Sequence, residues 1–196
     1  AVWLWVDPGQ DELLNGAGRQ ILDILGATGT KTEIWLGFPE SAFEGVEDGQ
    51  SLSRSLEVVK EILHECEEIG CTLALYNHGG WFGEPGNLVR IVESVGSQRL
   101  KIVYNFHHGH HQVDRFKENL AKMLPDLSTI NINGMRPEGP KIMTLGEGDL
   151  ELEMLRTILD SRYEGPIGIL GHTDGKDIRP VLERNLKGLE ELKKQL

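Results

Sequence analysis

The sequence predicts an α/β fold of consecutive βα units, arranged as a single domain over residues 1–196. Short β-rich runs alternate with amphipathic helical segments along the whole chain. No linker or shift in composition interrupts this alternation, and 196 residues suffice for one buried core. Regular βα alternation is typical of a parallel sheet covered by helices.

Each predicted element follows from its local pattern. Strands are expected at 2–6, 32–38, 72–77, 101–107, 128–133 and 166–170. Helices are expected at 13–25, 52–69, 88–95, 113–124, 150–159 and 178–192, with an acidic loop at 44–50. The strongest helix, 52–69, has one apolar stripe and ends before Gly70, a residue typical of the position after a helix. Pro125 stops the helix at 113–124.

The strand ends favour a barrel over a doubly wound sheet. The nucleotide-binding pattern G-x-G-x-x-G is absent, since Gly16 and Gly18 lie inside a helical pattern without the third glycine. The later strands end instead in amide and imidazole side chains: Asn77, His78, Asn105, His107, Asn131, Asn133 and His172. Catalytic groups of barrels lie at the C-terminal ends of several strands, so this repetition predicts a functional pocket. The alternative is a structural network in which each side chain is satisfied locally.

The densest polar cluster is HHGHH, which contains His107, His108, His110 and His111. Imidazole nitrogens suit ions such as Zn²⁺ better than Mg²⁺ or Ca²⁺. Alternation along a strand puts His107 and His108 on opposite faces, while a turn at Gly109 would let His110 or His111 join His107. The alternative is a solvated loop with one functional histidine.

Two further segments contain candidate site residues. In NHGGWFGEP, the two glycines allow close backbone approach to a ligand, and Trp81 either stacks on a sugar ring or covers the barrel mouth. In LGEGDLE, Glu147 is either a site carboxylate or an acidic loop residue placed favourably before a helix.

Composition limits the partners and the location. The net charge of −11 disfavours nucleic acid and anionic membrane surfaces. No apolar run approaches membrane-spanning length, and the first residues do not resemble a signal peptide, so a cytoplasmic protein is expected. Cys66 and Cys71 are expected to be buried thiols, with a disulfide as the alternative.

Several motifs together resemble one family. ALYNHGGWFGEP, VYNFHHGHHQVDRF, NINGM, LGEGDLELEMLRTILDSRYEGPIGIL and RNLKGLEEL resemble the xylose-isomerase-like sugar phosphate isomerase/epimerase superfamily, which includes endonuclease-IV-type enzymes. The similarity covers about residues 55–196. It implies a (β/α) TIM-type barrel. Because the family has eight strands, this chain is expected to be shortened or N-terminally truncated, with six to seven units.

The resemblance also implies a divalent metal ion, Zn²⁺ or Mn²⁺. At the family's ligand positions this sequence has Tyr76, His107, His110, Asn131 and Leu170, so imidazole and amide largely replace carboxylates. His78, His107, His110 and His172 are the ligands expected here.

The expected function is a metal-dependent isomerase or epimerase, or a related lyase, that acts on a sugar or keto-sugar by proton transfer. Its catalytic residues would be His78, His107 and Glu147. The expected substrate-binding residues are Asn77, Trp81, Asn105, Asn131 and Asn133. The alternative is a non-catalytic metal- or carbohydrate-binding barrel. The acidic charge and the missing carboxylates argue against an endonuclease-like phosphodiesterase. Missing strands would leave exposed edges, so a homo-oligomer, expected to be a dimer, is predicted.

Overall fold

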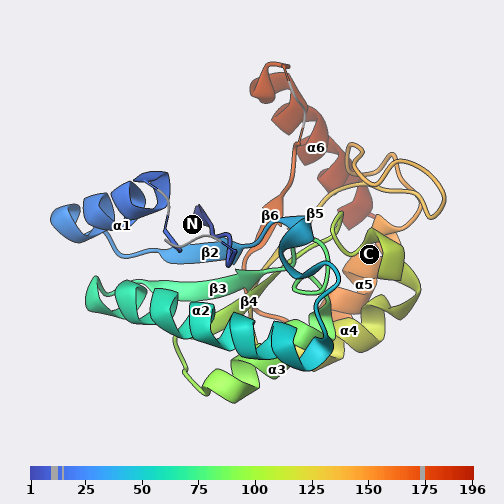
Figure 1. The fold of residues 1–196 in the computed structure, drawn as a ribbon. Helices are drawn as coiled ribbons and strands as arrows, with labels where there is room; N and C mark the ends of the chain where they lie inside the picture. Colours follow the sequence, from blue (N-terminus) through green and yellow to red (C-terminus); the bar gives the residue numbers. More distant parts are fainter. Residues whose placement is uncertain (10–12, 15, 173–174) are drawn as a thin grey trace. The chain divides into compact units, whose positions relative to one another are not determined.

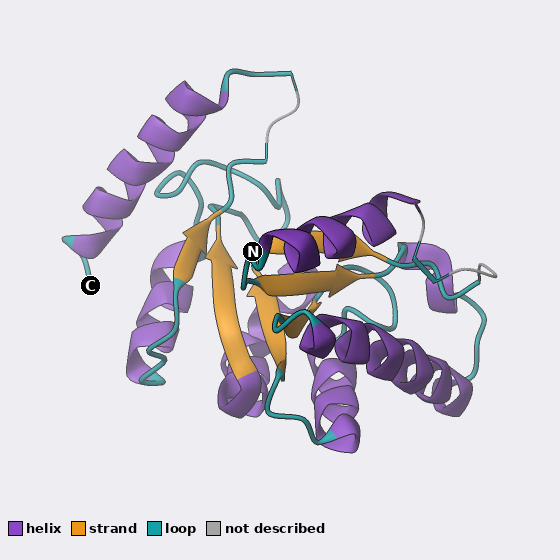
Figure 2. Cartoon of the chain, turned by 90° about the vertical axis from the view of Figure 1, so that its left-hand side faces the viewer, coloured by secondary structure: helices purple, strands orange, loops and turns teal. Residues whose placement is uncertain are grey.

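The computed structural model describes residues 1–9, 13–14, 16–172 and 175–196. Six strands alternate with helices and follow one another in the sheet in chain order, β1-β2-β3-β4-β5-β6 (Figure 1). The strands are β1 (Val2–Trp5), β2 (Glu33–Gly37), β3 (Thr72–Tyr76), β4 (Leu100–Asn105), β5 (Leu127–Ile132) and β6 (Ile167–Ile169). The helices are α1 (Gly16–Thr28), α2 (Asp48–Glu68), α3 (Pro85–Val95), α4 (Phe116–Met123), α5 (Glu151–Asp160) and α6 (Ile178–Lys193). The predicted α/β fold with parallel pairing is confirmed, and its alternation can be followed in Figure 2.

Short 3₁₀ helices account for part of the difference from the predicted boundaries. They are η1 (Glu40–Phe43), η2 (His110–Arg115) and η3 (Leu124–Asp126). The helix expected at 113–124 therefore becomes α-helical only at Phe116, and the helix expected at 52–69 already begins at Asp48, inside the expected acidic loop. The helix expected at 13–25 begins at Gly16 and continues to Thr28; residue 15 lies outside the described residues.

The chain divides into two compact units. Unit 1 comprises residues 1–103 and 125–128, and unit 2 comprises residues 104–124 and 129–196. The strands β4 and β5 each have residues in both units, and they lie next to each other in each unit. In unit 1 Ser128 Oγ donates to the Ile102 carbonyl (3.1 Å), and in unit 2 the Phe106 N–H donates to the Asn131 carbonyl (3.0 Å). The single-domain organisation over 1–196 stays a prediction.

Unit 1 buries both faces of β2 and β3. Ile34, Leu36, Leu73 and Leu75 are fully buried, as are Val59, Ile62 and Cys66 of α2, the helix that lies along β3 (Figure 1). Trp35, Ala74, Tyr76 and Val103 form a separate buried cluster. The two buried sets occupy alternate positions along β2 and β3, as expected of strands that are covered on both faces.

Unit 2 packs aromatic residues of β4 against α4. Tyr104 and the following Phe106 contact Phe116 of α4, with ring centroids 5.7 and 5.5 Å apart. The last helix, α6, begins at a cap in which Asp177 accepts a hydrogen bond from the Arg179 N–H (3.0 Å). Packing against β4 thus stabilises α4, and the Asp177 cap stabilises the start of α6.

Cys66 and Cys71 are free and buried, in agreement with the prediction of thiols. Burial, reinforced by the negative charge that Cys71 and neighbouring glutamates would contribute, raises the pKa of the Cys66 thiol to about 12. No helix in the described part of the chain has the length and apolar character needed to cross a membrane.

Candidate functional site

In unit 1, the imidazole of His78 is held directly after β3. Its Nδ1 lies 2.9 Å from the carbonyl oxygen of Phe38. A carbonyl oxygen only accepts, so Nδ1 carries the hydrogen and Nε2 is the basic nitrogen. The ring packs edge-on against Trp5, with centroids 4.7 Å apart, and parallel to Tyr76. The His78 ring is thus oriented by backbone and by aromatic neighbours.

The glycines after His78 serve backbone packing. Gly79 and Gly80 have φ of +40° and +59°, which side chains rarely adopt. A Cβ at Gly80 would lie 2.6 Å from the backbone oxygen of Glu40. The close approach predicted for a ligand is therefore made by η1 of the chain itself.

The side chain of Trp81 also has a structural partner. Its indole N–H donates to Asp48 (2.9 Å), and its ring contacts Phe43. Arg90 donates to the same carboxylate, and the two donors together hold the pKa of Asp48 below its ordinary value. This anchoring favours the covering role that the sequence left open for Trp81 over sugar stacking.

The position of Asn77 follows from the register of β3. Tyr76 clusters with Trp35 and Val103, so alternation assigns Asn77 to the face of Leu73 and Leu75. Asn77 is 1% exposed. In unit 1, the partly exposed His78 is better placed than Asn77 to meet a substrate.

In unit 2, the imidazole of His107 is held by Asn105 at the end of β4. The strand stops at Asn105, two residues earlier than predicted, because Asn105 Oδ1 lies 2.7 Å from His107 Nδ1 and also accepts from the His107 backbone N–H (3.4 Å). The two residues are 0% and 6% exposed. Asn105 therefore positions His107, and the ring's Nε2 is the basic nitrogen in this arrangement.

The other histidines of HHGHH have different partners after this turn. His107 and His108 have ring centroids only 3.7 Å apart, so the prediction of opposite faces was wrong, because the strand has already ended. His110 Nε2 lies 2.6 Å from the Arg136 carbonyl, and His111 contacts Gln112. Among the described residues, neither ring belongs to a group of three or more potential metal ligands.

The two asparagines of β5 differ in role. Asn133 is fully buried, and its Nδ2 donates to the carbonyls of Gly134 and Lys141, both at 2.8 Å. Asn133 thus clamps the segment that follows β5. Asn131 leans over Gly168 of β6, where a Cβ would lie 2.3 Å from Asn131 Oδ1.

Glu151 is a buried carboxylate that the sequence reasoning missed. It is 1% exposed at the start of α5. Its Oε1 accepts from the N–H groups of Gly146 and Gly148, both at 2.9 Å, and its Oε2 from that of Met135 (3.5 Å). The available signal was an acidic residue in the first turn of a helix, three residues after the second glycine of G-x-G. Glu151 fixes the exposed loop that contains Glu147.

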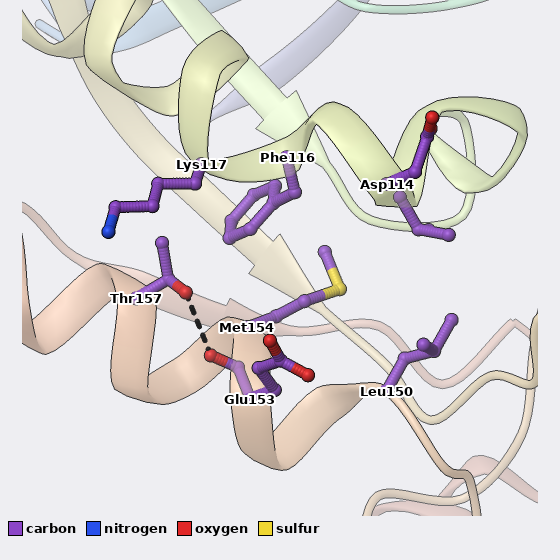
Figure 3. A pocket seen from close by; sticks show the side chains of 8 residues that line it. Asp114, Phe116, Lys117, Leu150, Glu153, Met154 and Thr157 are labelled. Carbon is purple, nitrogen blue, oxygen red and sulfur yellow. Dashed lines mark hydrogen bonds between the residues drawn. The ribbon is translucent and has the colours of Figure 1, made fainter.

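His172 and Glu147 line one pocket of unit 2. Its volume is about 240 Å³, and it lies between the segment 142–147, the end of β6 and α6. The His172 ring is 6.2 Å from the His107 ring, centroid to centroid. Another pocket, of about 290 Å³, lies between α4 and α5 and contains Phe116, Lys117 and Met154 (Figure 3). The predicted site residues do not line that second pocket.

The expected four-histidine metal site does not form among the residues that the structure describes. Within them, no three His, Cys, Asp or Glu side chains are grouped so as to hold an ion. A protein Zn²⁺ site has at least three such ligands. The ring centroids of His107 and His172 lie 6.2 Å apart, no third such ligand joins them among the described residues, and His110 is bonded to a backbone carbonyl. These donors do not fit a resident metal ion.

Comparison with known proteins identifies a family and a shared fold. A family model described as xylose isomerase-like TIM barrel matches residues 18–194. No curated protein matches the sequence. Many solved structures share the fold, and three illustrate the range.

The first is 3-keto-D-glucoside 4-epimerase from E. coli, with a TM-score of 0.70, 14% identity and coverage of 97% of this chain and 75% of the epimerase. The second is D-psicose 3-epimerase in the presence of D-fructose, with a TM-score of 0.70, 16% identity and coverage of 95% and 73%. The third is the IOLI protein with a zinc atom, with a TM-score of 0.70, 12% identity and coverage of 97% and 74%. At these identities the likeness concerns the fold.

Proposed function

The chain belongs to the xylose isomerase-like TIM barrel family as a shortened barrel of six βα units, and we propose that it is an isomerase or epimerase, or a related lyase, that moves a proton on a sugar or keto-sugar. The observation that carries the proposal is the buried pair Asn105–His107, joined at 2.7 Å at the end of β4. A general base needs a defined tautomer and a fixed direction, and Asn105 supplies both to His107.

The proposed reaction begins with His107. Its Nε2 removes the proton from a carbon next to a carbonyl group, and protonated His172 gives a proton to the carbonyl oxygen, which yields an enediol. The 6.2 Å between the ring centroids leaves room for a carbonyl and its neighbouring carbon to contact both rings. Delivery of a proton to the former carbonyl carbon, with loss of the hydroxyl proton on the neighbouring carbon, completes an isomerisation. Return of a proton to the opposite face of the neighbouring carbon, with loss of the enediol proton from the original carbonyl oxygen, completes an epimerisation. Glu147, in the pocket of His172, is the proposed second proton carrier.

The remaining polar residues support this chemistry as proposals. His78 has the same tautomer as His107, with its Nδ1 hydrogen on Phe38, and is the candidate base of unit 1. Asn131 is the amide that we propose for contact with substrate hydroxyl groups. Asn105 and Asn133 act through the groups that they position.

The Zn²⁺ or Mn²⁺ ion expected from the resemblance has no group of three ligands among the described residues, and no step above uses one. If an ion binds, His107 and His172 are two of the expected ligands, and their ring centroids lie 6.2 Å apart. Two imidazoles without a third protein ligand form a weak site. We therefore expect clearly less than one ion per chain, by elemental mass spectrometry, in protein purified without a chelator or polyhistidine tag. One tightly held ion per chain, lost in His107→Ala, would contradict this and restore a metal-dependent mechanism.

The test of the proposed function is exchange of a carbon-bound proton. The protein is incubated in D₂O with D-fructose, D-tagatose, D-psicose and a 3-keto-glucoside, and proton NMR follows loss of signal at carbons next to the carbonyl group. We expect one position of one substrate to exchange, with slower appearance of an epimer or isomer. The absence of exchange across such a panel, with binding retained, would favour the alternative.

That alternative is a carbohydrate-binding barrel without catalysis. It is favoured by the replacement of family carboxylates that the resemblance implies, since Tyr76, His107 and Leu170 stand at those positions. The predicted homodimer also stays a prediction. The strand β1 at the edge of the sheet exposes Trp3 and Trp5, at 44% and 42% of their surface, as the missing-strand argument expects.

A further inference from the structure

The pocket that contains His172 and Glu147 also contains two cationic side chains. Lys176 lies just before α6, and Arg184 lies two turns inside this helix. The opposite wall is the segment 142–147, which contributes Thr144 and Glu147. The polar lining therefore consists of two cations, one carboxylate, one imidazole, one hydroxyl group and the amide of Asn185.

These cations lack partners of opposite charge. Among the described residues, neither Lys176 nor Arg184 makes an ion pair, although the chain has 31 acidic and 20 basic residues. Arg179 on the same helix, by contrast, pairs with Glu183 at 3.0 Å. The Thr144 hydroxyl likewise makes no hydrogen bond within the described chain. Donors of positive charge thus converge on one small pocket in a protein that is otherwise acidic.

The walls of this pocket are already assembled. Asn185 is buried, accepts from the Leu145 N–H (3.0 Å) and donates to the Val181 carbonyl (2.9 Å). Gly188 allows α6 to contact the segment directly, because a Cβ there would lie 1.7 Å from the Leu145 carbonyl oxygen. Glu151 holds the same segment through Gly146. Little ordering is therefore required when a ligand binds.

We propose that this pocket binds the anionic group of the substrate, so that the substrate is a phosphorylated or carboxylated sugar. Arg184 provides a planar pair of donors suited to a phosphate or carboxylate, Lys176 adds a point charge, and Thr144 adds a neutral donor. The carboxylate of Glu147 repels a second anionic group, so the pocket is limited to one. The identification of this ligand as the substrate rests on the proposed function, whereas anion binding does not.

The test is anion binding measured by isothermal titration calorimetry on the whole chain, without turnover. The probes are inorganic phosphate, glucose 6-phosphate and gluconate, at constant ionic strength in chloride. We expect Arg184→Ala and Lys176→Ala each to weaken binding about fivefold, as for partly exposed charge contacts. Glu147→Gln should strengthen binding about twofold, because it removes a repulsive charge.

Lys187→Ala is the matched control, since it removes one positive charge from α6 outside the pocket. The affinity of this variant for the three anions should stay within about twofold of the affinity of the unchanged protein, because a screened surface charge acts weakly at a distance. Tighter binding of glucose 6-phosphate than of gluconate assigns a phosphate group, and the reverse assigns a carboxylate. Binding by none of the three probes, or equal losses in Lys187→Ala and Arg184→Ala, overturns the proposal. A failed deuterium exchange with anion binding intact would overturn the proposed reaction alone.

Discussion

His107→Gln should lower the rate of proton exchange by about 100-fold or more, the contribution typical of a positioned general base. Glutamine retains a polar side chain of similar length in a site that is 6% exposed, so the fold should persist. Its amide, however, cannot accept a proton near neutral pH. Exchange is measured in D₂O with whichever sugar of the panel is active, and thermal melting monitors folding.

His64→Gln is the control for this experiment, because His64 lies on α2 with an exposed side chain beside Glu68. It should leave the exchange rate unchanged. If His107→Gln exchanged the substrate proton as fast as the unchanged protein does, the assignment of His107 as base would be wrong and His78 would become the leading candidate. A large loss in His64→Gln would point instead to a general effect on folding.

Glu151→Ala should lower the free energy of unfolding by about 3 kcal/mol, since it removes an ionised acceptor from buried backbone donors. The N–H groups of Gly146 and Gly148 lose their acceptor at 2.9 Å, and that of Met135 loses its weaker one. Urea denaturation followed by circular dichroism measures the change. Exchange activity should fall as well, because the loop of Glu147 loses its anchor.

Glu153→Ala removes an exposed carboxylate from the same helical turn and should change the free energy of unfolding by less than about 0.5 kcal/mol. Glu151→Gln keeps one carbonyl acceptor, so its loss of unfolding free energy should lie between the losses of Glu151→Ala and Glu153→Ala. Equal stability of Glu151→Ala and Glu153→Ala would show that the buried carboxylate does not hold the loop.

Several predicted site residues have structural partners for a common reason. Trp81, Asn133 and His110 were candidates because aromatic, amide and imidazole groups can all meet a sugar or an ion. Their partners in the fold are the Asp48 carboxylate, the Lys141 carbonyl and the Arg136 carbonyl, between 8 and 33 residues away in the chain. No local pattern contains those contacts, so a structural role and a functional role looked alike.

By itself, the sequence determined the order of strands and helices, their parallel arrangement, the family and the enrichment of imidazole and amide groups at strand ends. These properties depend on hydrophobic periodicity and on short motifs, which neighbouring residues encode. Only the tertiary structure decided that β4 ends at Asn105, which nitrogen of His78 and His107 is basic, and that Glu151 is buried. Those outcomes depend on which backbone groups each side chain meets after folding, and a polar side chain takes whichever partner satisfies its hydrogen bonds.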